Sequence, residues 1–447
     1  MADYRIPGVG FGLFANGETV LRGFGLTNIE NPQPVTPDTV FPIASISKTV
    51  VTTAVMRLVE EGRLDLEAPV RNYIPDFRVQ DESASREVRL WHLLTHTPGW
   101  EGQLRTPDRG DETLAHFTAG LADLPQLAPP GTVWSYNNAG FGVAGRILEI
   151  ITGGTIHDAL SDLVFEPLGL THAFTRTGTA MTHRFAAGHR ERSGKTELNR
   201  PFRLPANVAA GGAAMSVSSL LRYARFHLGD GTANGRRVLA RQSLAQMRAP
   251  RLRKNATSDE IGLGWHLRTL NGISTAAHGG TLGGHCLHVQ LVPERSLAFA
   301  MLTNHNEGWR LIQDVEQALL ESYASLSRAP NQATGGNRGG NEDMRVHAKP
   351  LAEQPDVAPY VGTYQRPPNG TAEVRAEGAG VVVRGGGAGE NDLPLIFWGP
   401  DLAYAEPRAE GRYPYAGMPV EFIRTTDGRV GWIRINGRIA RKDRRAQ

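Results

Sequence analysis

Hydrophobic residues that recur every three or four positions predict helices in the central part of this 447-residue chain. The clearest helix spans 45–61, where Gly62 provides a C-terminal stop signal. Its apolar positions are Ile46, Val50, Val51, Ala54, Val55 and Leu58. Similar patterns predict helices over 140–151, 156–164, 216–228 and 311–326.

Alternating apolar and polar positions predict strands on both sides of these helices. At the start, residues 9–14 and 19–24 flank Asn16-Gly17, the strongest short sequence signal for a β-hairpin. After the helices, further strands are expected at 262–267, 274–278, 287–292 and 297–302. One antiparallel sheet packed against a helical region is an α+β fold, and we expect a cleft between the two parts.

The last third of the chain has a different character. Residues 329–350 are rich in glycine, asparagine and charge, so we interpret them as a linker after a first domain over 1–328. From 351 to 447 no helical pattern intervenes, and the expected short strands predict a small antiparallel β-barrel. These strands are at 360–364, 372–376, 381–383, 395–398, 420–424 and 430–435. The basic cluster at 438–445 is interpreted as a solvated tail.

Composition and charge restrict the classes of function. The net charge of +3 is spread along the chain, which argues against a nucleic-acid partner. The single cysteine, Cys286, excludes an internal disulfide. No run of 18 apolar residues is present, and the N-terminus lacks the basic and apolar regions of a signal peptide. As written, the protein is expected in the cytoplasm without a membrane span, and exported if the true start lies upstream.

Several common enzyme motifs are missing from the sequence. There is no G-x-S-x-G element, which argues against an α/β-hydrolase. No H-E-x-x-H or paired-cysteine spacing is present, so neither a metal nor a cofactor is expected. His92 and His96 have helical spacing, but no third ligand can be named, and we interpret them as structural.

One lysine is placed where it favours chemistry rather than simple charge. Only five of the 48 basic residues are lysines, and Lys48 follows Ser45 by three residues at the start of the 45–61 helix. Residues three apart share a helix face, so the Lys48 ammonium can reach the Ser45 hydroxyl. A buried lysine can shift its pKa and exchange protons, which arginine cannot do. The simpler alternative is a capping serine followed by a solvated lysine.

Two further elements extend this candidate site. Tyr136 and Asn138 lie in a polar stretch just before the 140–151 helix, and a lysine ammonium nearby would lower the pKa of the Tyr136 phenol. Taken alone, Tyr136 is a packing residue. His278, Gly279 and Gly280 close the predicted 274–278 strand, and Thr281 begins a turn. Glycines there would let a backbone amide approach a ligand closely, as an oxyanion hole requires.

In this order and spacing, the three elements resemble the serine β-lactamase and penicillin-binding-protein clan. The resemblance is to class C β-lactamases, family VIII carboxylesterases and D-amino-acid peptidases, and it covers residues 5–325. It implies that Ser45 is the nucleophile, Lys48 its activator, and Tyr136 with Asn138 a tyrosine-x-asparagine motif. It places His278 to Gly280 where relatives have KTG, with the amides of Ser45 and Thr281 as the oxyanion hole. The predicted barrel is similar to the lipocalin-like domains of some members.

One departure from the family pattern concerns the substrate. The KTG lysine, which in β-lactamases helps to hold the carboxylate of the antibiotic, is replaced by His278. The resemblance therefore implies a serine hydrolase that acts through an acyl-enzyme on small esters or D-amino-acid amides and peptides. A β-lactamase, a D-alanyl-D-alanine carboxypeptidase, and a non-catalytic peptide-binding or assembly protein are the alternatives. Whether Lys48 or Tyr136 is the base stays open, as does homo-oligomerisation.

Overall fold

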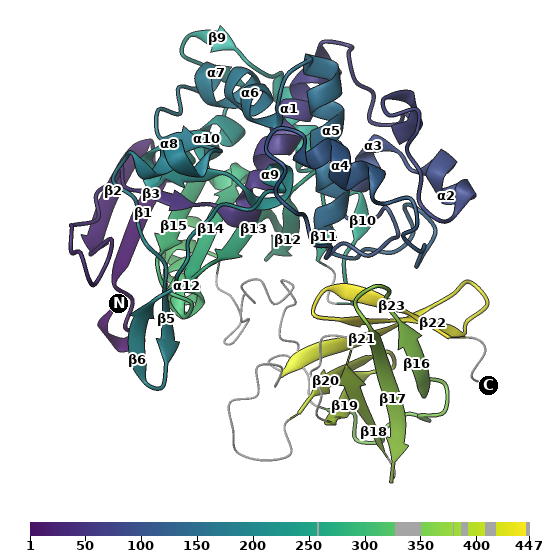
Figure 1. Cartoon of the computed structure of the whole chain (residues 1–447). Coiled ribbons are helices and arrows are strands. Elements are labelled where there is room, and N and C mark those ends of the chain that lie inside the picture. The colour runs from purple at the N-terminus through teal and green to yellow at the C-terminus, as the bar shows by residue number, and fades with distance from the viewer. Residues whose placement is uncertain (257–258, 327–349, 379, 386–391, 407–416, 444–447) are drawn as a thin grey trace.

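The computed structural model describes residues 1–256, 259–326, 350–378, 380–385, 392–406 and 417–443. Residues 329–349 of the predicted linker therefore lie outside the described part. The chain forms a sheet with helices on both faces, and a separate barrel at its C-terminal end (Figure 1). The expected α+β architecture with a β-barrel is confirmed. The division of the chain into two domains at the linker stays a prediction.

The main sheet is antiparallel and joins the two ends of the first 326 residues. Its strand order is β10-β11-β12-β13-β14-β15-β1-β2. The bounds are β1 Gly8–Ala15, β2 Glu18–Gly25, β10 Leu252–Arg253, β11 Glu260–Ile261, β12 His266–Leu270, β13 Ile273–Leu282, β14 His285–Val292 and β15 Leu297–Thr303. The Asn16-Gly17 hairpin is confirmed, with both residues at positive φ. Pairing of Val9 with Thr303 then brings the start of the chain beside β15.

Two predicted strands differ from the structure. The strand expected at 262–267 is wrong, because residues 262–265 form a loop between β11 and β12 in which Gly264 has a φ of 73°. The strand expected to close at Gly279-Gly280 continues as β13 to Leu282, and the turn lies at Gly283-Gly284. Gly279 and Gly280 pair with β14 as part of the strand, so neither of them forms a turn.

Alternation along the strands gives the sheet two buried faces. Ala298, Ala300 and Leu302 pack in the large core with α10, Val217–Leu228. The intervening residues pack against α12, Gly308–Ala324, on the opposite face. Successive strand side chains point to opposite sides, so β15 reads as one continuous apolar run. The predicted helices at 216–228 and 311–326 are these two, each confirmed to within a few residues.

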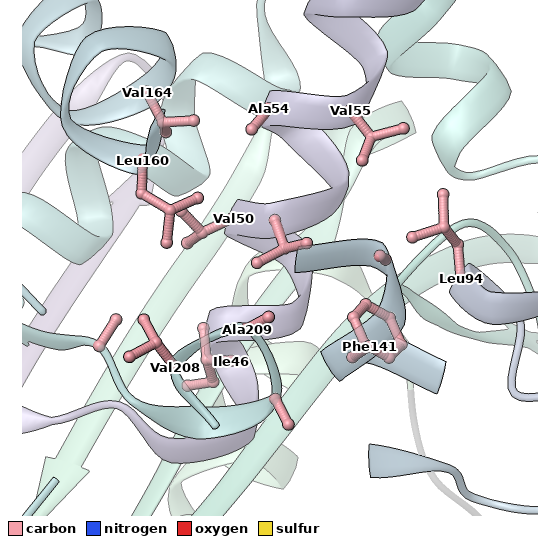
Figure 2. Packing of buried hydrophobic residues seen from close by; sticks show 14 of the residues in the cluster. Ile46, Val50, Ala54, Val55, Leu94, Phe141, Leu160, Val164, Val208 and Ala209 are labelled. Atoms are coloured by element: carbon pink, nitrogen blue, oxygen red, sulfur yellow. The ribbon is translucent and has the colours of Figure 1, made fainter. Parts of the chain in front are cut away.

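The helical region packs around α1, Ser47–Glu60, which is buried on nearly all sides. Figure 2 shows Val50 and Ala54 against Leu160 and Val164, with Phe141 and Leu94 on the other flank. Each such buried aliphatic side chain contributes about 1.5–3 kcal/mol. The other helices are α2 Glu82–Glu87, α3 Leu90–Leu94, α4 Thr113–Ala119, α5 Asn138–Thr152, α6 Ile156–Leu160, α7 Glu166–Leu168, α8 Thr177–Met181, α9 Val208–Gly211 and α11 Arg241–Met247. A small sheet joins β3 Val40–Pro42, β7 Ala214–Ser216 and β4 Ala173–Phe174.

The C-terminal barrel has its own hydrophobic core and closes by pairing β16 with β23. Its strands are β16 Gly362–Gln365, β17 Thr371–Glu377, β18 Gly380–Gly385, β19 Leu393–Gly399, β20 Leu402–Ala405, β21 Met418–Arg424, β22 Val430–Ile435 and β23 Arg438–Lys442. Strands β20 and β23 were not predicted from the sequence pattern. The interpretation of 438–445 as a solvated tail is wrong for 438–442, because Ile439 and Ala440 are buried and pair with β22.

Candidate active site

Ser45 lies at the junction between the small sheet and α1. It is half-buried in a 3-10 turn, Ala44–Ile46, that leads directly into the helix. Ala44, the preceding residue, has a φ of 46°, a left-handed conformation that costs a residue other than glycine about 1–2 kcal/mol. Such strain persists only where the surrounding structure holds it, and it is found most often at functional sites. The turn places the Ser45 side chain on the wall of a cavity.

Lys48 is fully buried one helical turn after Ser45. Its Nζ lies 3.4 Å from Ser45 Oγ and donates a hydrogen bond of 2.5 Å to the carbonyl of Ala210 in α9. Among the residues that the structure describes, it forms no ion pair with a carboxylate. Burial therefore holds the pKa of Lys48 well below its usual value, and the positive charge of Arg438 lowers it further. A neutral amine at this position can accept a proton.

Tyr136 lies in the loop before α5, with its phenol directed at the same group of residues. Lys48 Nζ is 4.9 Å from the centre of the Tyr136 ring, which stacks on His96 at 4.5 Å. Within the described part of the chain, the buried phenol oxygen makes no hydrogen bond of good geometry. Burial raises the pKa of Tyr136 to about 12, although the Ser45 hydroxyl and Arg438 both lower it. The free protein thus holds Tyr136 as a neutral phenol.

Asn138 is the first residue of α5 and lines the same cavity. Its Nδ2 donates to Gln103 Oε1 at 3.1 Å. The helix is capped by the preceding residue, because Asn137 Oδ1 accepts from the N–H of Gly140 at 2.7 Å. This cap starts α5 directly after Tyr136, so the tyrosine loop and Asn138 are held together by the geometry of one helix end.

His278 lines the cavity from β13 as a neutral side chain. Its Nδ1 is 2.8 Å from the carbonyl of Gly279, which can only accept, so Nδ1 carries the proton. Burial and the nearby charge of Lys48 lower the pKa of His278 to about 3. At neutral pH it therefore supplies no positive charge where the family pattern has a lysine.

The two glycines after His278 allow β13 to pass very close to its neighbours. A Cβ on Gly280 would lie 2.6 Å from the carbonyl oxygen of Ile43, beside Ser45, and one on Gly279 would lie 2.5 Å from the Trp309 ring. Trp309 Nε1 also donates to Thr281 Oγ1 at 2.8 Å. A side chain at Gly280 would separate β13 from the Ser45 turn, and one at Gly279 would collide with Trp309. The oxyanion role of the Ser45 and Thr281 amides stays a prediction.

These elements share one cavity of about 680 Å³. Of the predicted site residues, those on its wall are Ser45, Tyr136, Asn138, His278, Gly279 and Thr281. Lys48 and Gly280 lie behind the wall, in contact with the Ser45 turn. The structure thus brings all of the predicted site residues to one place, while their chemical roles stay predictions.

Known proteins that are similar to this chain identify its family. A family model described as Beta-lactamase matches residues 1–321. The chain belongs to the β-lactamase family. "Penicillin-binding protein 4" from Amycolatopsis lactamdurans is 33% identical over 374 residues, which are 81% of this chain and 94% of that protein. "Esterase EstB" from Burkholderia gladioli is 35% identical over 186 residues, covering 38% of this chain and 47% of the esterase.

Solved structures of relatives show the same fold over different lengths. The crystal structure of SurE with D-Leu superposes with a TM-score of 0.80 at 24% identity, over 99% of this chain and 96% of that one. A class C β-lactamase superposes with a TM-score of 0.59 at 22% identity, over 68% of this chain and 90% of that one. This member of the β-lactamase family is therefore an enzyme of the serine hydrolase type.

Several residues around the site of this β-lactamase-family enzyme were not found from its sequence. Asn436 and Arg438 of the barrel line the cavity, and the scarce lysine Lys254 lines it while paired with Asp259 at 3.3 Å. The Asn436-Gly437 dipeptide after the predicted strand at 430–435 is a hairpin signal that could have revealed β23. No sequence signal indicates that this hairpin would reach the catalytic region.

The other residues that could have had a catalytic or metal-binding role, His92, His96 and Cys286, lie in environments that suit a structural role. His92 ends up in α3 and His96 beyond it, where the Asn137 N–H donates to His96 Nδ1 at 2.8 Å. No group of metal-ligating side chains that could hold an ion occurs in the described ranges. Burial raises the pKa of the Cys286 thiol to about 12, so it is not a thiolate nucleophile. None of the described helices is long and apolar enough to cross a bilayer.

Proposed function

We propose that the protein hydrolyses small esters or D-amino-acid amides and peptides through a covalent ester on Ser45. The observation that carries the proposal is the fully buried Lys48, with Nζ 3.4 Å from Ser45 Oγ and a depressed pKa. A buried lysine whose pKa lies well below its usual value gives up its own proton more readily, and the free amine can then remove the proton of a hydroxyl. Tyr136, as a neutral phenol beside both groups, is suited to passing a proton onward.

The proposed reaction has two halves, acylation of Ser45 and hydrolysis of the acyl-enzyme. Ser45 Oγ forms a bond to the substrate carbonyl carbon while its proton moves to Lys48 Nζ. The tetrahedral intermediate then breaks its bond to the amine or alcohol, which leaves with a proton delivered through Tyr136. Water adds to the acyl-enzyme by the reverse route, gives up one proton to the same network and releases the acid, which restores the Ser45 hydroxyl. Lys48 and Tyr136 titrate as a coupled pair in this scheme.

The polar groups of the cavity support this substrate class over β-lactams. A neutral His278 offers no charge to the carboxylate of an antibiotic. The cavity of about 680 Å³ also has room for a group larger than a short-chain ester. That the structure of SurE was determined with D-Leu is a further reason to include D-amino-acid derivatives. 

A D-alanyl-D-alanine carboxypeptidase is the second candidate, and one observation favours it. Arg438 lines the cavity and is a cation that a terminal carboxylate could meet, although Glu101 lies 3.7 Å from its Nη1. The name of the Amycolatopsis lactamdurans relative, penicillin-binding protein 4, points in the same direction. An octameric homologue from Pyrococcus abyssi, with a TM-score of 0.63 at 21% identity, makes assembly worth measuring in the same preparation.

A panel of substrates tests the proposal directly. Short-chain esters, D-aminoacyl amides, a peptide ending in D-alanyl-D-alanine and a chromogenic cephalosporin are compared by kcat/KM on wild type and on Ser45→Ala. We expect an ester or a D-amino-acid derivative to have the highest value, and every activity to vanish in Ser45→Ala. A cephalosporin that exceeds all other substrates would overturn the substrate class. Absence of steady-state turnover on the whole panel would favour a non-catalytic peptide-binding or assembly protein.

A further inference from the structure

The hairpin between β22 and β23 of the barrel reaches the Tyr136 loop. Its turn, Asn436-Gly437, has both residues at positive φ, as a tight two-residue hairpin requires. The N–H of Tyr136 donates to the carbonyl of Gly437 at 2.9 Å. Arg438 Nη1 donates to the carbonyl of Tyr136 at 2.6 Å. The barrel thus holds both backbone polar groups of the proposed catalytic tyrosine.

The same hairpin holds the residues that precede Tyr136. The N–H of Ile439 donates to Ser135 Oγ at 3.2 Å, and Arg434 Nη2 donates to the carbonyl of Trp134 at 3.1 Å. Residues 134–137 form no helix or strand, so their backbone groups need partners from elsewhere. These hydrogen bonds hold in place a loop that has no regular secondary structure of its own. This restraint comes from residues about 300 positions later in the chain.

A buried charge cluster sets the position of Arg438. Glu101, which is 2% exposed, lies 3.7 Å from Arg438 and 3.1 Å from Arg366, so two barrel arginines meet one carboxylate of the helical region. Arg438 Nη2 also donates to Gln103 Oε1 at 2.8 Å. Replacing one partner of this buried cluster would leave an uncompensated charge, so the docked arrangement requires both the arginines and the carboxylate.

The guanidinium also faces the catalytic groups as a charge. Arg438 Cζ lies 5.4 Å from the centre of the Tyr136 ring. Its charge lowers the pKa of Lys48 and that of Tyr136, in each case after the larger effect of burial. The other titratable groups that face this pair are the imidazoles of His96, His266 and His278, which burial holds neutral by lowering their pKa. Arg438 is then the barrel residue whose charge acts on both Lys48 and Tyr136.

We propose that Arg438 is a positioning residue for Tyr136, through which the C-terminal barrel completes the active site by holding the tyrosine loop and placing a positive charge beside it. The proposal rests on the proposed function of Ser45, Lys48 and Tyr136, and it assigns the barrel a part in catalysis. The simpler alternative is a barrel that only covers the cavity. Under that alternative, the identity of the side chain at position 438 affects substrate access but leaves the proton network unchanged.

The test compares three full-length variants. Arg438→Gln removes the charge, whereas Arg438→Lys keeps a charge but loses the double donation to Tyr136 O and Gln103 Oε1. Arg424→Gln is the matched control, because Arg424 pairs with Asp401 within the barrel at 2.8 Å. For each protein, kcat and KM are measured across pH on the best substrate of the panel. The rate of Ser45 labelling by a phosphonate and the circular dichroism spectrum are measured in parallel.

For Arg438→Gln we expect kcat to fall on the order of tenfold to a hundredfold, since misplacement of a catalytic group has such effects. Loss of the positive charge raises the pKa values of the pair, so the acidic limb of kcat/KM should move to higher pH. Arg438→Lys should keep the limb near its wild-type position with a smaller loss of kcat, and Arg424→Gln should match wild type in both.

Two results would overturn the proposal. One is an Arg438→Gln protein with wild-type kcat and an unmoved acidic limb. The other is an equal loss in both Arg438 variants with no shift of the limb, which would mean that the hairpin acts through packing alone. If wild type itself shows no turnover and no labelling at Ser45, the proposed function fails and not the inference about Arg438. If Arg438→Gln does not fold, the proposal is decided by comparing the kcat and the acidic limb of Arg438→Lys with those of the Arg424→Gln control.

Discussion

Replacing Lys48 by methionine should make the protein more stable and far less active. Lys48 is fully buried, and its amine donates to Ser45 Oγ and to the carbonyl of Ala210. In the described part of the chain no carboxylate offsets its charge. Methionine keeps a similar length and apolar contact area without a charge. The substitution is therefore expected to raise the stability of the protein and to lower its activity.

The magnitude follows from two opposing terms. Removing the amine leaves the buried carbonyl of Ala210 without this donor, which costs about 1–3 kcal/mol. Removing an uncompensated buried charge recovers a desolvation penalty of several kcal/mol, on the order of 4. The net gain in the free energy of unfolding is then about 2 kcal/mol near neutral pH. Loss of the proposed general base should reduce kcat by a factor of about 10² to 10⁴.

The gain should also depend on pH with a definite sign. Because the pKa of Lys48 in the folded state lies below 10.5, the unfolded chain binds more protons between the two values, and wild-type stability rises with pH in that window. The advantage of the variant is complete below the folded pKa. It should shrink as the pH rises and be nearly lost at 10.5, where half of the unfolded chains have already released this proton.

Urea denaturation followed by tryptophan fluorescence, at neutral pH and near pH 10.5, measures both effects. Lys195→Met is the matched control, since Lys195 is exposed in the hairpin formed by β5, His189–Arg192, and β6, Lys195–Leu198. Its replacement should change stability by less than about 0.5 kcal/mol. A Lys48→Met protein less stable than wild type at neutral pH would refute the reasoning. So would a gain of equal size at both pH values, because a desolvated charge cannot produce it.

The remaining predictions concern the nucleophile, the histidine and a glycine. Ser45→Ala should abolish labelling by a serine-directed phosphonate while leaving the circular dichroism spectrum unchanged; mass spectrometry that finds the label on another serine would contradict the assignment. His278→Lys should raise kcat/KM for a cephalosporin, because it restores a charge for the carboxylate, and an unchanged value in a folded protein would show that carboxylate recognition is not the missing part. Gly280→Ala should lower the free energy of unfolding by about 1–3 kcal/mol and reduce turnover, since the added Cβ would lie 2.6 Å from Ile43 O. Gly178→Ala, which has open space at its Cβ, is the control, and equal effects of the two changes on thermal melting would refute the steric argument.

Short-range patterns in the sequence determined much of the fold and the identity of the central site residues. The three-residue spacing of Ser45 and Lys48 acts within one helical turn, so the apolar periodicity of α1 was enough to predict that the two side chains meet. The Asn16-Gly17 hairpin is likewise local, because the dipeptide itself favours the two positive φ values. Where geometry is decided by neighbours within a few residues, the pattern contains the needed information.

Only the tertiary structure decided the features that depend on distant segments. The sequence pattern predicted that this strand closes at Gly279-Gly280, whereas pairing with β14 continues β13 through both glycines. The missing side chain of Gly280 lets the strand pass close to the Ser45 turn. The neutral state of His278 follows from burial and a nearby charge, which no local pattern reports. From the sequence, Arg438 was interpreted as part of a solvated tail, because charged side chains are mostly exposed in folded proteins. In the structure the barrel packs against the helical region, and this places Arg438 beside Tyr136. There Glu101 and the backbone of the tyrosine loop provide the partners that water would otherwise supply.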